Sequence, residues 1–141
     1  MQLNYFAILV GVTSLFLVAI YPFMKRITYW PQFALGLTFN WGAFLGWAAV
    51  KGDLQLPAFI LYVAGIFWTL GYDTIYAHQD KEDDLIVGVK SSALKLRDKT
   101  RPWLFVFYTA AVILIAETGY LVGLSWPFYV ALVFSALQLL W

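Results

Sequence analysis

Apolar residues fill long stretches of this chain without a single charge. The charge-free stretches are residues 1–24, 27–50, 54–72, 102–116 and 118–141. Polar and apolar positions do not alternate within them, and they are too long for the roughly 10-residue strands of a membrane barrel. A membrane-spanning helix needs about 20 mostly apolar residues. The pattern therefore predicts an all-α fold, a polytopic bundle of transmembrane helices.

Prolines mark where the predicted helices begin. They stand at Pro31, Pro57, Pro102 and Pro127, at or just before the start of an apolar stretch, where their missing N–H costs nothing. With these starts the predicted spans are residues 3–23, 31–50, 57–76, 103–122 and 127–141. Residues 77–101 form a loop rich in acidic and basic side chains, and all five spans belong to one domain.

The last apolar stretch is shorter than a full span. From Pro127 it has 15 residues, or about 22 Å of helix. The hydrocarbon core of a bilayer is about 30 Å thick. We therefore expect the chain to be a fragment of a longer protein.

Composition and charge placement support a membrane protein and predict its orientation. The chain is 62% hydrophobic and 12% charged, against about 45–50% and 25% in soluble domains. The first and third loops hold eight Lys and Arg residues, whereas the second and fourth hold Lys51 alone. Loops rich in Lys and Arg stay on the cytoplasmic or matrix side of a membrane. We expect an integral protein of a bacterial inner membrane or the mitochondrial inner membrane, with these two loops in the cytoplasm or the matrix.

Acidic residues gather directly after the third apolar stretch. Four aspartates and one glutamate fall within 12 residues, in a chain with eight acidic residues. If the third helix continued through these residues at 100° per residue, three aspartates would lie on one face of it, with two further residues beside them. The three form a stripe of Asp73, Asp80 and Asp84, and the residues beside it are Asp83 and Tyr76. This pattern indicates either a solvated acidic loop or a cation site. The depth of Asp73 favours the cation site, because a carboxylate inside the membrane is costly without a partner.

The residue types favour a hard metal ion as the cation. The chain has no cysteine and one histidine, so its ligands are oxygen atoms. Mg²⁺ binds one or two carboxylates together with waters and substrate phosphates, whereas the spacing of a calcium-binding EF-hand is absent. A Mg²⁺ site at the membrane face suggests a lipid with a diphosphate head group. Cations on the same predicted side are Lys25, Arg26, Lys90, Lys95 and Arg97.

Two sequence elements resemble those of a known family. Residues 72–84, YDTIYAHQDKEDD, resemble the second aspartate-rich motif of UbiA-type intramembrane prenyltransferases, Tyr-Asp-x-x-Tyr-Ala-x-x-Asp-x-x-Asp-Asp. Tyr21 and Lys25 resemble the family's Tyr-x-x-x-Lys element in an earlier loop. The long motif is specific, the short one is not, and the similarity extends over the whole chain. Residues 21–50 are most similar to the branch that acts on 4-hydroxybenzoate in ubiquinone synthesis.

The resemblance implies a reaction. Mg²⁺ between two aspartate-rich motifs would bind the diphosphate of a polyprenyl diphosphate, whose allylic C–O bond then ionises. The ring of 4-hydroxybenzoate would attack the allylic cation, at the carbon next to the hydroxyl, in a cavity that excludes water. The expected partners are these two substrates and the lipid bilayer, and no nucleic acid.

The resemblance also implies roles for individual residues. The metal ligands would be Asp73, Asp80, Asp83 and Asp84. The residues in contact with the diphosphate would be Tyr21, Lys25, Tyr76 and Lys90. Asn40, an amide inside the second span, would either bond near the acceptor or join two helices.

The chain departs from the family pattern at the first aspartate-rich motif, Asn-Asp-x-x-Asp-x-x-x-Asp. No aspartate precedes Asp53, so that motif is absent. The family fold is a ring of nine helices, of which this chain resembles the fourth to the eighth. We therefore expect half of an active site, and no turnover by the chain alone.

Two other functions remain open at this point. The first is a UbiA-type enzyme with a different acceptor, such as a naphthoate, homogentisate, haem or a glycerol phosphate lipid. The second is a cation-binding segment of a transporter or channel. A transporter would place acidic residues at mid-membrane on several helices, whereas these cluster at one interface beside lysines.

Overall fold

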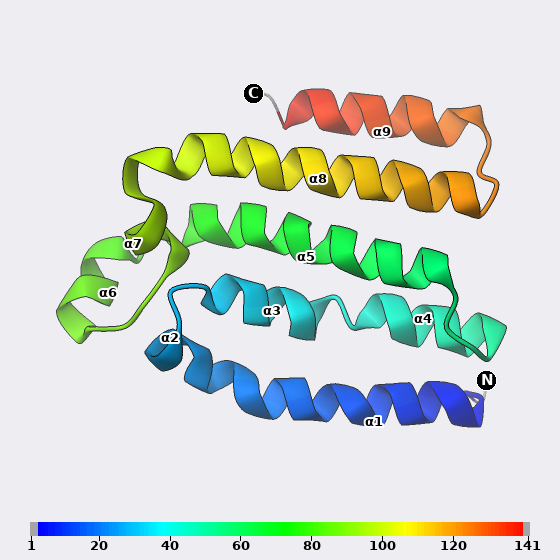
Figure 1. Cartoon of the computed structure of the whole chain (residues 1–141), viewed down its shortest axis with the longest axis horizontal. Coiled ribbons are helices and arrows are strands. Elements are labelled where there is room, and N and C mark those ends of the chain that lie inside the picture. The colour runs from blue at the N-terminus through cyan, green and yellow to red at the C-terminus, as the bar shows by residue number, and fades with distance from the viewer. Residues whose placement is uncertain (1–2, 140–141) are drawn as a thin grey trace.

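The computed structural model of the protein describes residues 3–139, and every regular element in that range is a helix. The long helices lie side by side in chain order (Figure 1). They are α1 (Tyr5–Ile20), α3 (Pro31–Phe39) followed by α4 (Gly42–Lys51), α5 (Leu56–Tyr76), α8 (Thr100–Leu121) and α9 (Trp126–Gln138). The short elements are η1 (Tyr21–Phe23), α2 (Met24–Ile27), α6 (Lys81–Val87), α7 (Ser92–Leu96) and η2 (Arg97–Lys99). The predicted all-helical membrane bundle is confirmed.

Helix length and composition identify the stretches that can cross a membrane. Within the described residues, four are long and apolar enough: Tyr5–Ile27, Pro31–Lys51, Leu56–Tyr76 and Ser92–Leu121. The α9 helix is apolar but shorter, with 13 residues. The last predicted span includes residues 140–141, which lie outside the described part of the chain.

The second predicted span is not one continuous helix, because the structure divides it at Asn40. The α3 helix ends at Phe39 and α4 begins at Gly42. Asn40 Nδ2 donates to Gly36 O at 2.9 Å, and the same carbonyl also accepts the Asn40 N–H at 3.1 Å. The same amide donates to Thr69 Oγ1 on α5 at 2.8 Å. This single side chain therefore lies at the break and joins it to α5.

An aromatic cluster beside this break forms the centre of the core. The ring centres of Phe44 and Tyr62 are 4.3 Å apart, and Trp41 stands edge-on to both. Trp41 Nε1 donates to Val10 O, and the Tyr62 hydroxyl donates to Leu37 O, each at 2.8 Å. These bonds satisfy the polar ends of the buried Tyr62 ring and the partly buried Trp41 ring, and they tie together α1, α3, α4 and α5.

The third helix does not continue through the acidic residues. The α5 helix ends at Tyr76, and the His78 N–H donates to Ile75 O at 3.1 Å, which tightens the last turn. His78 Nδ1 also lies 2.9 Å from Thr74 O, a carbonyl near the helix end. The later acidic residues begin a separate helix, α6, so the stripe expected on one continuous helix does not form.

Candidate functional site

Two loops that are distant in the sequence meet at the end of the bundle that carries α2, α6 and α7 (Figure 1). The Lys90 N–H donates to Lys25 O at 2.9 Å, and Lys90 Nζ donates to Ile27 O at 3.0 Å. The same ammonium lies 5.4 Å from the centre of the Tyr29 ring, at cation–π distance. In this structure Lys90 therefore holds the two loops together.

An ion pair joins α2 to α6 at this junction. Lys25 Nζ lies 3.8 Å from Asp84 Oδ1. The Lys25 side chain is 49% exposed, whereas the Asp84 side chain is only 7% exposed. Asp84 Oδ2 is buried and has no hydrogen-bond partner among residues 3–139. Because buried carboxylate oxygens are costly unless they are bonded, Asp84 offers one oxygen that remains able to bind a cation.

Asp73 and Tyr21 lie close to this ion pair. Asp73 is half-buried in the last turn of α5, and the charges of Lys25 and Asp80 act on it. The charge of Asp73 in turn acts on the Tyr21 hydroxyl. Tyr21 and Lys25 are four residues apart across η1 and α2, about one helical turn. The structure thus brings together the two sequence elements that carried the family resemblance.

The remaining predicted site residues lie further out. Tyr76 is 60% exposed, and Asp80 and Asp83 are exposed as well. Among the described side chains, no three of His, Asp or Glu gather closely enough to hold a metal ion. The chain turns after α5, so the four predicted ligands do not meet in one place, and their metal-binding roles stay predictions.

A buried polar network lies beneath the acidic residues. The hydroxyls of Thr74 and Ser92 share a hydrogen bond of 2.8 Å, and the Ser92 N–H donates to Gln32 Oε1 at 3.2 Å. All three side chains are at most 2% exposed. The network links α3, α5 and α7 directly next to Asp73.

Sequence reasoning missed this network. Isolated Ser, Thr and Gln residues are common near loops, and no spacing distinguishes them. One signal could have found Thr74, because it stands next to Asp73 inside the aspartate-rich motif. His78 was also passed over, although its ring joins the end of α5 to Thr100 at the start of α8, with Nε2 3.3 Å from Oγ1.

The bonds of Asn40 support the second of its two predicted roles, which is to join two helices. Its amide is engaged by Gly36 and Thr69, and both partners belong to the bundle itself. Its role toward an acceptor is untested by this geometry.

Comparison with known proteins identifies the family. The profile described as "UbiA prenyltransferase family" matches residues 1–141, the whole chain. The chain belongs to the UbiA prenyltransferase family. The resemblance seen in the two motifs is therefore confirmed.

Several curated relatives of this UbiA-family chain carry the name "4-hydroxybenzoate polyprenyltransferase, mitochondrial". The Caenorhabditis elegans protein is 54% identical over 100% of this chain and 40% of its own length. The Arabidopsis thaliana protein is 52% identical over 100% of this chain and 35% of its own length. The Homo sapiens protein is 53% identical over 92% of this chain and 35% of its own length. The chain thus spans 35–40% of the length of these relatives. No solved structure matches it.

The side chains at this end of the UbiA-family chain fit a hard divalent cation. Asp73 and Asp84 supply carboxylate oxygens, and Asp84 Oδ2 is buried without a bonded partner in the described range. Two carboxylates match the small number that Mg²⁺ takes from protein when substrate phosphates and waters complete its coordination.

Proposed function

We propose that this chain forms half of an intramembrane site that transfers a polyprenyl group from a polyprenyl diphosphate to 4-hydroxybenzoate, in ubiquinone synthesis. The observation that carries the proposal is the junction of Lys25, Asp84 and Asp73 with Tyr21, where two separated family motifs meet at one end of a membrane bundle. The printed names of the relatives supply the acceptor.

The junction is suited to bind a diphosphate and to stabilise its departure. Asp73 and Asp84 would hold Mg²⁺, with Asp80 near Asp73 and Asp83 on the same helix as Asp84. Bound Mg²⁺ supplies positive charge against the diphosphate. The Lys25 ammonium, half-exposed toward solvent, is placed to pair with a diphosphate oxygen, and the Tyr21 hydroxyl can donate to another. Charge placed before the reaction stabilises the leaving group as the allylic C–O bond breaks.

The aromatic acceptor completes the reaction. Its ring carbon next to the hydroxyl forms a bond to the allylic carbon, and that ring carbon then loses its proton to the released diphosphate. Water must be excluded, because it would react with the allylic cation first. The neighbouring spans are apolar and aromatic, which supports this requirement.

We place the site in the mitochondrial inner membrane or a bacterial inner membrane, on the matrix or cytoplasmic side. The excess of basic residues in the first and third loops supports that side. The relatives named above are mitochondrial by name.

A chimera tests the proposal. Residues 1–141 replace the matching segment of the C. elegans relative, which aligns with the whole chain. Membranes carrying the chimera receive a radiolabelled polyprenyl diphosphate and 4-hydroxybenzoate, and the prenylated product is measured. We expect product formation comparable to that of the parent, lost with a chelator and restored by Mg²⁺.

Two results would contradict the proposal. A chimera that inserts and folds but forms no product would reject the transferase function of this segment. A chimera that prenylates a naphthoate or homogentisate in preference to 4-hydroxybenzoate would reject the acceptor.

A further inference from the structure

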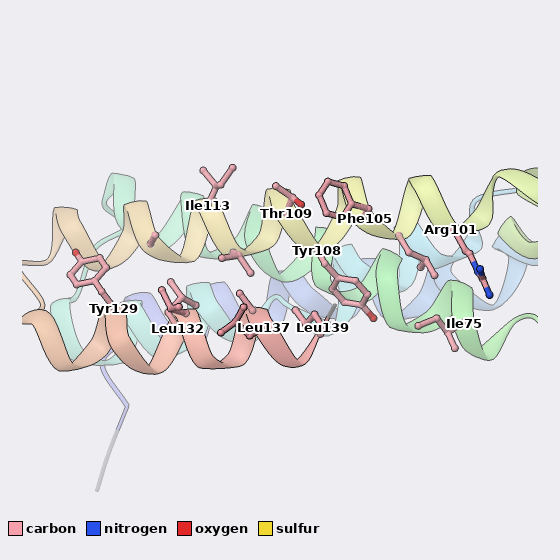
Figure 2. A pocket seen from close by; sticks show the side chains of 15 residues that line it. Ile75, Arg101, Phe105, Tyr108, Thr109, Ile113, Tyr129, Leu132, Leu137 and Leu139 are labelled. Carbon is pink, nitrogen blue, oxygen red and sulfur yellow. The ribbon is translucent and has the colours of Figure 1, made fainter. Parts of the chain in front are cut away.

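A long groove runs between α8 and α9 (Figure 2). Its volume is about 720 Å³. The side chains that line it are mostly apolar and include Ile75, Phe105, Ile113, Leu132, Val133 and Leu137. Arg101 lies at one end of the groove and Tyr129 near the other (Figure 2). The groove thus combines a cationic end with an apolar body.

Close packing fixes the two helices beside the groove. The Phe128 ring of α9 lies directly on Gly119 of α8, where even an added Cβ would collide with it. On the other side, the Tyr108 ring lies against Gly71 of α5, 2.7 Å from where a Cβ would stand. The walls of the groove are therefore held by the bundle itself.

Arg101 has no anionic partner in the part of the chain that the structure describes. The ion pair within 4.0 Å there is that of Lys25 and Asp84. Arg101 lies in the first turn of α8, which begins at Thr100 after the charged residues Arg97, Asp98 and Lys99. A guanidinium at this level is placed to meet the head groups of one leaflet.

We propose that this groove binds an anionic phospholipid, with its phosphate on Arg101 and one acyl chain along α8. A guanidinium can bind a phosphate through two parallel hydrogen bonds, and a lipid with net negative charge has no head-group cation to offset this attraction. From Arg101 to Ala116 the groove follows about 22 Å of helix, which is more than the ~15 Å of hydrocarbon in one leaflet. The positive charge of Arg101 complements the phosphate, and the apolar lining of the groove complements the acyl chain.

The groove lies apart from the proposed transfer site. Ile75 lines it, and Asp73 stands two residues earlier on α5, about 200° away around the helix. Among the described residues, none of the predicted metal ligands or diphosphate-binding residues lines the groove. A lipid in the groove therefore faces away from the acidic residues, so the proposal does not depend on the prenyl-transfer reaction.

Photolabelling tests this site. The C. elegans chimera that carries residues 1–141 is placed in nanodiscs that contain a trace of phosphatidylglycerol with a photoreactive diazirine in one acyl chain. Phosphatidylcholine with the same acyl chain is the matched control lipid. After illumination, labelled residues are mapped by mass spectrometry. We expect groove residues such as Phe105 and Val133 to be labelled several-fold more by the phosphatidylglycerol probe.

Variants decide whether Arg101 is responsible. Arg101→Gln should reduce phosphatidylglycerol labelling of the groove to the phosphatidylcholine level, whereas Arg101→Lys and the neighbouring Lys99→Gln should preserve the preference. Equal labelling by both lipids, unchanged in Arg101→Gln, would overturn the proposal and indicate an ordinary lipid-facing surface. Absence of groove labelling by either lipid would also overturn it, because protein then covers the groove.

Discussion

Asp84 is the residue whose surroundings differ most from those of an ordinary surface carboxylate. Only one of its two oxygens lies near Lys25, and the other is buried without a bonded partner in the described chain. Removing a carboxylate from water is costly, and the 3.8 Å pair with a half-exposed lysine offsets only part of that cost because solvent screens it. This arrangement is expected where a bound cation supplies the remaining stabilisation.

Asp84→Asn is expected to weaken metal activation of prenyl transfer. The amide keeps the size of the side chain but loses the charge that attracts Mg²⁺. In the C. elegans chimera, the Mg²⁺ concentration for half-maximal activity should rise by at least about 10-fold. Glu82→Gln is the matched control, since Glu82 is an exposed acidic residue of the same helix. Equal Mg²⁺ requirements in the two variants would remove Asp84 from the metal site.

At the scale of elements, two polar contacts connect helices that hydrophobic packing alone would leave free to slide. One is the bond from Asn40 to Thr69 between the α3–α4 break and α5. The other is the chain of bonds through Ser92 that holds α7 against α3 and α5. Hydrogen bonds between membrane helices contribute about 0.6–2 kcal/mol each. Both contacts fix the positions of the helices that they join, and both add to the stability of the bundle.

Ser92→Ala should destabilise the chain and misplace the acidic end of α5. It leaves the buried Thr74 hydroxyl without this partner, at a cost of about 1–3 kcal/mol in the free energy of unfolding. Unfolding in mixed micelles measures the stability, and product formation by the chimera measures the effect on the site. Ser135→Ala is the control, because Ser135 is exposed and bonds only to Ala131 of its own helix. If the two variants behave alike, the network does not position the site.

Gly65→Ala and Gly46→Ala should have opposite effects, although both add one methyl group to a helix. At Gly65 the added Cβ would collide with the Asn40 side chain, so the bond to Thr69 should break and stability should fall. At Gly46 nothing lies within 4 Å, and alanine should be neutral or stabilise by up to about 1 kcal/mol. Unfolding curves of the two variants test this, and a Gly65→Ala chain as stable as the parent would contradict the close packing.

For the whole molecule, the distribution of charge predicts which end faces which compartment. The end with α2, α6 and α7 carries the basic loops and the proposed site, and Lys51 is the basic residue of the opposite loops. A membrane protein retains its basic loops on the cytoplasmic or matrix side. The proposed reaction would therefore draw 4-hydroxybenzoate from that compartment and the prenyl donor from the bilayer.

Single cysteines can test this orientation, because the sequence has none of its own. Glu82→Cys lies in α6 and Asp53→Cys in the loop before α5, and both positions are exposed. In sealed vesicles of known orientation, a membrane-impermeant maleimide should label the first only from the matrix or cytoplasmic side and the second only from the other. Labelling of both from one side would reject the predicted topology.

The sequence by itself determined the class of the fold and the family, and it predicted the chemistry of the site. Long charge-free stretches permit only helices in a bilayer, because each helix satisfies its own backbone hydrogen bonds. The spacing of Tyr21 and Lys25, together with the aspartate-rich motif, was enough to indicate the family. These features are local in the chain, so they can be recognised without coordinates.

Only the tertiary structure decided how the site residues are placed. Periodicity places the end of the third span at Tyr76, but it cannot show how the chain continues, because the bond from the His78 ring and the tightened last turn depend on the path of the chain. The pairing of Lys25 with Asp84, and the bonds of Lys90 to Lys25 and Ile27, join residues about 60 positions apart. The Asn40 break and the α8–α9 groove likewise arise from contacts between helices, which the order of residues in one helix does not contain.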